Sequence, residues 1–126
     1  MLLPTTGDVA GSGASLGSAA DGGLVYRYQT HVQVQNGHWR EFHALLKELN
    51  ATMGAKGLVP FQVWESSFGP WNGALLIADY ESLAAYEREH DAMHADPACM
   101  QLWRQMVPHF EGIPWTDLWW TPYGPD

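Results

Sequence analysis

Apolar and polar residues alternate over the first patterned segment of the chain, Leu24 to Gln35. One set of alternate positions is aromatic or β-branched: Tyr26, Tyr28, Thr30, Val32 and Val34. The residues between them are charged or polar: Arg27, Gln29, His31, Gln33 and Gln35. A period of two built from these residue types predicts a long β-strand with one apolar and one polar face.

The pattern then changes to a helical period. Five large apolar residues follow one another at helical spacing: Trp39, Phe42, Leu46, Leu49 and Met53. This spacing predicts an amphipathic helix, which Gly54 and Gly57 would end. Two further strands are expected at Val59–Phe68 and Trp71–Tyr80, and the short turn between them favours a hairpin.

The last third of the chain predicts a divided helix and a final strand. Ser82 is a suitable N-cap, and the face of the helix that follows holds Leu83, Tyr86, His90 and Met93. Asp96-Pro97 would start a second helical part, which carries Cys99, Trp103, Met106 and Phe110. A short strand is expected at Asp117–Tyr123. The order βαββαβ predicts a ferredoxin-like α+β domain with its helices on one face of an antiparallel sheet.

Composition limits the class of protein. The chain has 126 residues, enough for one domain, and 46% are hydrophobic. Residues 1–23 are rich in Gly, Ala and Ser and lack aromatic side chains, so we expect a flexible leader before a domain at 24–126. The net charge of −8 without a basic run argues against nucleic-acid binding and against anionic membranes. One cysteine, no apolar stretch long enough to span a membrane and no signal-like start predict a cytoplasmic protein.

His90 is the most informative candidate for chemistry. Its spacing from Tyr86 and Met93 turns it toward the sheet, where an imidazole can act as a general acid or base. Tyr28 could donate its hydroxyl to a developing oxyanion. The plainer alternative is a core histidine with one satisfied hydrogen bond. His90 and His94 have a spacing that can bind metal, but two ligands do not make a site, so no metal is expected.

Aromatic residues suggest a cavity between sheet and helices. We expect its walls to include Tyr26, Trp64 and Trp103, with His43 facing it from the first helix; these residues also suit a plain core. Seven tryptophans favour a flat aromatic or apolar ligand. A second candidate set lies on the polar strand face: Arg27, Gln29 and His31, which Glu65 could join. That set is either a satisfied polar network at a dimer contact or a catalytic Arg-Glu-His pocket.

Short motifs resemble the NIPSNAP-like proteins. The run Asn36–Phe42 stands where those proteins carry a Pro-Gly turn and a helix that begins with an apolar residue and a Glu-Phe pair. The divided second helix with Asp96-Pro97, Trp103 and a late tryptophan are also similar, and the likeness covers nearly all of residues 24–123. It implies the dimeric α+β barrel superfamily, in which the sheets of two copies close into a barrel and a ligand cavity lies between each sheet and its helices.

The resemblance implies a range of activities and has one departure. The superfamily includes cofactor-free antibiotic-biosynthesis monooxygenases, polyketide cyclases, haem-degrading enzymes and small-molecule isomerases, and one fold hosts many chemistries. NIPSNAP-like proteins place an acid, an arginine and a tyrosine on the helix-facing side of the first strand. Here those positions hold Tyr28, Thr30 and Val32, so no role of that trio carries over.

Three functional hypotheses follow. The leading one is a small cofactor-independent enzyme of microbial secondary metabolism, a homodimer that acts on an aromatic or polyketide-like molecule by acid/base chemistry of the cyclase, isomerase or monooxygenase type. His90 would transfer the proton and Tyr28 would stabilise the oxyanion. The second hypothesis is a haem-binding or haem-degrading protein with His90 as axial ligand. The third is a non-catalytic binding or accessory dimer, in which the pocket only holds a small molecule or is collapsed.

Overall fold

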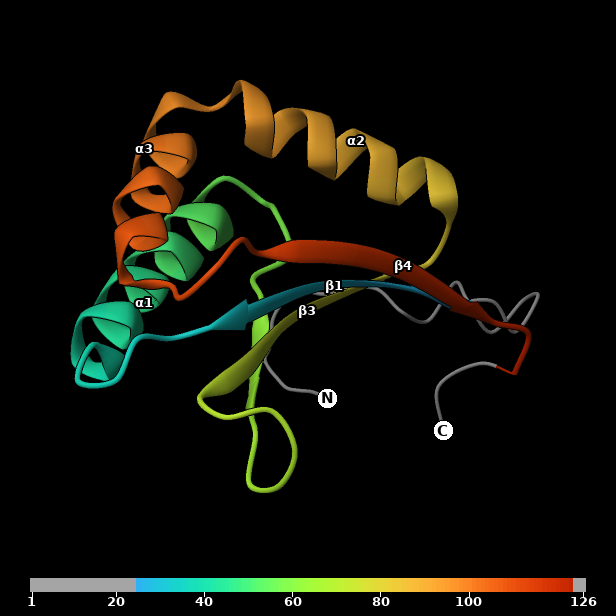
Figure 1. Ribbon diagram of the computed structural model, residues 1–126. Helices are drawn as coiled ribbons and strands as arrows, with labels where there is room; N and C mark the ends of the chain where they lie inside the picture. The colour runs from blue at the N-terminus through green and yellow to red at the C-terminus, as the bar shows by residue number, and fades with distance from the viewer. Residues whose placement is uncertain (1–24, 124–126) are drawn as a thin grey trace.

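A computed structural model describes residues 25–123, so the expected leader at 1–23 lies outside the described residues. The elements are, in order, β1 (Val25–Gln33), α1 (Trp39–Ala55), β2 (Gln62–Glu65), β3 (Gly73–Tyr80), α2 (Leu83–Ala95), α3 (Pro97–Met106), the 3₁₀ helix η2 (Val107–His109) and β4 (Trp115–Thr121). The strands form one antiparallel sheet in the order β2-β3-β1-β4, and the helices cover one of its faces (Figure 1). This confirms the ferredoxin-like βαββαβ prediction.

The strand register decides which side chains face the helices. Tyr28 pairs with Ala78 of β3 and Leu118 of β4, and this row lies on the helix side. His31 pairs with Leu75 and Trp115, and Leu75 also pairs with Trp64. Because successive residues of a strand point to opposite faces, this second row lies on the face away from the helices, which we call the open face.

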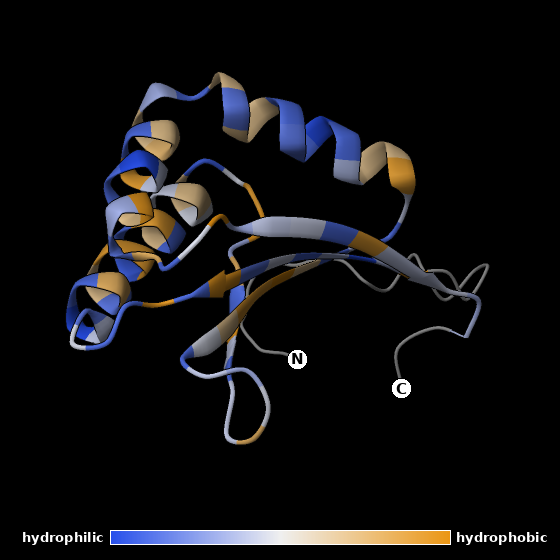
Figure 2. Ribbon diagram, in the orientation of Figure 1, coloured by the Kyte–Doolittle hydropathy of each residue, from blue (hydrophilic) through white to orange (hydrophobic). Residues whose placement is uncertain are grey.

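The core lies between the sheet and the pair α1 and α3. The apolar stripe of α1 is buried at Phe42, Leu46, Leu49 and Met53, as its spacing predicts. Helix α3 buries Cys99, Leu102 and Met106 against the same layer. In Figure 2, apolar residues of these two helices and of β3 are coloured toward orange, and they lie in this layer. Burial of several large apolar side chains, each contributing about 2 kcal/mol, makes this half the stable part of the domain.

The predicted caps hold the divided helix. The Ser82 hydroxyl accepts a hydrogen bond from the Ala85 N–H at 3.0 Å, which starts α2. The Asp96 carboxylate accepts from the Cys99 N–H at 2.9 Å and starts α3, with Pro97 at its first position. Asp96 also pairs with Lys56 at the end of α1. The break between α2 and α3 is therefore a fixed corner.

All four strands differ from their predicted bounds, and the second and the last have a clear physical reason. The second is shorter than Val59–Phe68 because its early backbone groups bond to side chains: the Asn50 amide bonds both the N–H and the C=O of Phe61. At its other end, the chain turns away through Gly69, whose φ is +108°. The last strand starts at Trp115 rather than Asp117, because Trp115 still pairs with His31 of β1.

Helix α2 is held less firmly than the other two helices. It buries one residue, Ala85, whereas α1 buries four. Since amide exchange through local opening depends on buried contacts, we expect protection in α2 to be at least about tenfold lower than in α1. Hydrogen–deuterium exchange with mass spectrometry on the full chain measures this. Equal protection in the two helices would contradict it.

Candidate functional site

A small pocket lies between α2 and the sheet. Nine residues line it, from the sheet, from α2, from the end of α1 and from the segment that follows α1: Tyr28, Met53, Leu58, Phe61, Tyr80, Tyr86, Glu89, His90 and Met93. The free space at its centre is about 10 Å³, which is roughly the room that one water molecule needs. Its own aromatic side chains therefore fill most of the space under α2.

Tyr28, Tyr86 and His90 form the aromatic part of the pocket. Tyr28 reaches it from β1, and the other two stand one turn apart on α2. The ring of Tyr28 lies 5.4 Å from that of Tyr86 and 6.1 Å from that of His90, the latter edge-on at 77°. The rings of Tyr86 and His90 are 5.4 Å apart. The strand period and the helix period thus bring together the two residues that the sequence proposes for chemistry, Tyr28 and His90.

Electrostatics favours the neutral form of His90. Burial lowers the pKa of His90, and the neighbouring His94, whose ring centre is 4.1 Å away, lowers it further, while Asp91 acts in the opposite direction. His94 itself is engaged outside the pocket, where its Nδ1 donates to the His90 carbonyl at 2.8 Å. A neutral imidazole beside a phenol can accept a proton, which is the requirement for a general base.

Glu89 is a pocket residue that the sequence patterns did not single out. Its Oε1 accepts a hydrogen bond from the Val59 N–H at 2.8 Å. Burial raises the pKa of Glu89, and it also raises the pKa of Tyr80 and of Tyr86. Glu89 lies three residues after Tyr86 and four before Met93, a helical spacing that could have indicated a pocket residue. It was missed because it lies at the margin of the apolar face.

Two candidate residues lie at a different place. His43 and Glu65 are both exposed, and His43 Nε2 lies 2.5 Å from Glu65 Oε2. Glu65 pairs with Ala74, and Ala74 with Val32, so Glu65 is on the helix side and does not join Arg27 and His31. The expectation of an Arg-Glu-His set is therefore wrong. His43 does not face the His90 pocket either, because Glu65 holds it at the edge formed by β2.

The predicted aromatic walls are also separated. Trp64 lies on the open face and is 60% exposed, so its placement in the helix-side cavity is wrong. Trp103 of α3 packs on Phe110, with ring centres 5.7 Å apart, and does not line the pocket. Tyr26 is on the helix side of β1 and pairs with Tyr80, but it too lies outside the pocket lining. The three positions of β1 at which this chain departs from the NIPSNAP-like pattern are also separated. Thr30 and Val32 are buried in the core, and of the three only Tyr28 lines the pocket.

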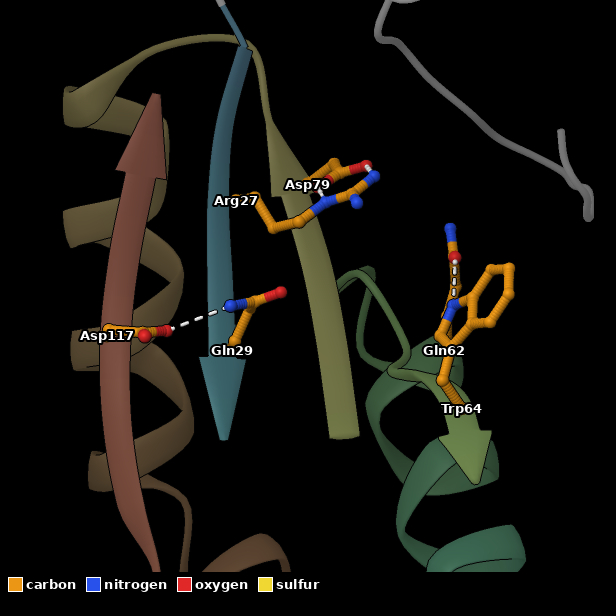
Figure 3. A network of polar contacts seen from close by, with 6 residues as sticks. All are labelled: Arg27, Gln29, Gln62, Trp64, Asp79 and Asp117. Atoms are coloured by element: carbon orange, nitrogen blue, oxygen red, sulfur yellow. Dashed lines mark hydrogen bonds and ion pairs between the residues drawn. The ribbon is translucent and has the colours of Figure 1, made fainter. Parts of the chain in front are cut away.

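The open face carries polar pairs, and Figure 3 shows two of them, Arg27 with Asp79 and Gln29 with Asp117. Arg27 forms a two-pronged ion pair with Asp79, at 2.8 and 2.9 Å, and this partner holds the pKa of Arg27 above its usual value. Gln29 and His31 both contact Asp117, at 3.1 and 3.2 Å. The His31 ring stacks on that of Trp115 at 3.6 Å. Neighbours on the face itself thus satisfy its charged groups.

A shallow groove of about 270 Å³ runs along one end of the open face, beside Arg27, Asp79 and Trp119. It is wider than the pocket under α2. Its only cation, Arg27, is already paired with Asp79. The groove is therefore a depression in the surface that offers no free group for proton transfer.

Two other kinds of site are absent from residues 25–123. No three His, Cys, Asp or Glu side chains there gather closely enough to hold a metal ion. In that same part of the chain, no helix is both long and apolar enough to cross a bilayer.

Comparison with known proteins identifies the family. The family model described as NIPSNAP matches residues 28–113, more than half of the chain. This range begins at Tyr28 and contains the whole pocket lining. The chain has no significant match among curated protein sequences.

Solved structures share the fold at low sequence identity. A NIPSNAP family protein of unknown function from Agrobacterium tumefaciens aligns with a TM-score of 0.65 at 16% identity, over 81% of this chain and 91% of that one. A NIPSNAP domain protein from Burkholderia xenovorans gives 0.63 at 14%, over 80% and 99%. A protein from Caulobacter crescentus, named as a candidate antibiotic biosynthesis monooxygenase, gives 0.60 at 20%, over 77% and 88%. At these identities the likeness shows the fold alone.

Proposed function

The chain belongs to the NIPSNAP family, and we propose that it is a small proton-transfer enzyme that binds an apolar aromatic or polyketide-like molecule under α2. The observation that carries the proposal is the convergence of a neutral imidazole, His90, and a phenol, Tyr28, in a pocket with apolar walls. The name of the Caulobacter protein, which shares the fold, is consistent with small-molecule chemistry. A role in microbial secondary metabolism is part of the proposal.

The two side chains divide the reaction between them. His90 takes a proton from carbon next to a carbonyl, or from a hydroxyl, and becomes an imidazolium. The oxygen that gains negative charge accepts a hydrogen bond from the Tyr28 hydroxyl, which lowers the barrier. Return of the proton to a different carbon completes an isomerisation or accompanies a cyclisation. These steps need no redox cofactor because only a proton moves; oxygenation of the same carbanion would use dioxygen as oxidant.

Ligand entry requires α2 to move. A space of about 10 Å³ holds one water molecule and no aromatic ring. Helix α2 is the wall that can yield, since it buries Ala85 alone and touches the sheet through half-buried side chains. If α2 stays closed, no aromatic molecule enters, and the protein is the accessory dimer of the third hypothesis, with a pocket that its own side chains fill.

Haem does not fit the site as it stands. The His90 imidazole lies against the rings of Tyr28, Tyr86 and His94, and the adjoining space is far smaller than a porphyrin. The proposed reaction uses no haem.

An exchange assay tests the function without knowledge of the natural substrate. The probe is 2-tetralone, a neutral bicyclic ketone with acidic α-hydrogens, in deuterated buffer, with ¹H NMR as readout. We expect the full chain to speed loss of the α-hydrogen signal above that caused by free imidazole at the same concentration. Equal rates would contradict the proposed function.

We also propose that two copies pair through the open face. Within residues 25–123 the helices lie on one side of the sheet, and the open face exposes Trp64, Trp115 and Trp119 at 57–61%. Its charged side chains are paired with one another, so covering them leaves no bare charge. An exposed aromatic surface of this kind is typical of an interface.

Substitution in the middle of the open face tests this dimer. Leu75, flanked in register by Trp64 and His31, is changed to arginine, which would place a charge between the sheets. We expect Leu75→Arg to sediment as a monomer, with affinity reduced by at least about 100-fold. Leu83→Arg, the same change on the exposed start of α2, should remain dimeric. A monomeric wild type, or a dimer unaffected by Leu75→Arg, contradicts the proposed interface.

A further inference from the structure

We propose that Glu89 makes the pocket selective for neutral aromatic molecules that carry a hydrogen-bond donor, such as a hydroxyl, and excludes anionic ones. The inference rests on the proposed function of the same pocket. It concerns which molecules enter, whereas the proton transfer itself is assigned to His90 and Tyr28.

The position of Glu89 leaves one carboxylate oxygen for a ligand. Oε1 is fixed by the Val59 N–H at 2.8 Å, so the side chain is held in the pocket wall. Oε2 accepts no hydrogen bond from any described residue. Glu89 is half-buried, so this acceptor keeps some contact with solvent until a ligand covers it. A ligand that covers it without bringing a donor leaves a polar group unsatisfied, which is costly, whereas a ligand that brings a donor avoids that cost. A hydroxyl or N–H group on the ligand supplies that donor.

The charge of the wall excludes anions. Among the described residues that line the pocket, Glu89 is the acidic one and none is lysine or arginine. The neighbouring Arg88 acts on Glu89 at a distance, but it is exposed and does not line the pocket. A carboxylate or phosphate entering the site would lose its water and meet a like charge without a compensating cation.

Burial supports the same conclusion. Glu89 is half-buried in the pocket wall, where it loses part of its water, and this burial raises the pKa of its carboxyl. A poorly solvated carboxylate forms strong hydrogen bonds with uncharged donors and repels anions more effectively than an exposed one.

The test compares two probes with the same ring system, 2-naphthol and 2-naphthoate, at about pH 7.5, where carboxyl groups of ordinary pKa are ionised. Binding to the full chain is followed by the ε-methyl signals of ¹³C-labelled methionines. Met53 and Met93 line the pocket, and Met100 and Met106 do not, so the spectrum also locates the probe. We expect 2-naphthol to bind at least about tenfold more tightly than 2-naphthoate.

Glu89→Gln removes the charge and keeps an oxygen for the Val59 N–H, so the wall should retain its shape. We expect this variant to reduce the preference to within about threefold. Glu87→Gln is the matched control: it removes the same charge from an exposed position of the same helix, and it should leave the preference unchanged.

The outcomes separate this inference from the proposed function. If both probes shift Met53 and Met93 with equal affinity, or if Glu89→Gln and Glu87→Gln behave alike, the role of Glu89 is overturned and the pocket stands as a binding site. If neither probe moves these methyl signals, the proposed function fails and the inference fails with it.

Discussion

Replacing His90 by glutamine is expected to slow the protein-dependent exchange of the 2-tetralone α-hydrogens by about 100-fold or more, because a positioned general base contributes about that much. Glutamine has a similar size and no basic nitrogen, so the aromatic contacts to Tyr28 and Tyr86 lose little packing. Tyr28→Phe, which removes only the hydroxyl, should cost about tenfold, the value of one hydrogen bond to developing charge.

His94→Gln is the matched control for His90. It changes a histidine of the same helix that does not line the pocket, so exchange near neutral pH should persist. The pH profile sharpens the comparison. Because burial and His94 lower the pKa of His90, the fall in rate with decreasing pH should occur at lower pH than for an ordinary histidine, and His94→Gln should move that fall to higher pH. A rate unaffected by His90→Gln would favour a binding protein without catalysis.

Replacing Phe42 by alanine is expected to lower the free energy of unfolding by about 3–5 kcal/mol, since it empties a buried site in the core. Phe42 is fully buried on α1, and its ring lies 6.0 Å from that of Phe110. Chemical denaturation of the full chain measures the change. For a small domain, a loss of this size is a large part of the total stability.

Phe68→Ala is the matched control for this substitution. Phe68 is 98% exposed in the loop that joins β2 and β3, so the change should stay within about 0.5 kcal/mol. A similar loss in both variants would show that the core does not lie between α1, α3 and the sheet.

The fold was predictable because local periods determine its elements. The stripe from Phe42 to Met53 and the alternation along β1 each match one type of element, and the caps at Ser82 and Asp96 lie where hydroxyl and carboxylate side chains can accept backbone N–H groups. The same periods carried Tyr28 and His90 to one pocket, since each faces inward on its own element.

The rest of the site depends on contacts between distant segments. Alternation placed Gln62 and Trp64 together on one face of β2, but the face that meets the helices was decided by Phe61, which is buried and held by Asn50 of α1. Glu65 lies on the same side of the strand as Phe61, the helix side, and it contacts His43 there. Glu89 entered the pocket wall because Val59 offers an N–H, and no local pattern contains that contact.

The proposed function requires small aromatic molecules to bind under α2, and the position of bound 2-tetralone shows whether they do. With ¹³C-methyl-labelled methionine in the full chain, we predict that the ring of the probe shifts the signals of Met53 and Met93 and leaves that of Met100 in place. Unchanged Met53 and Met93 signals, with shifts in the indole signals of Trp64 or Trp119 on the open face, would contradict it.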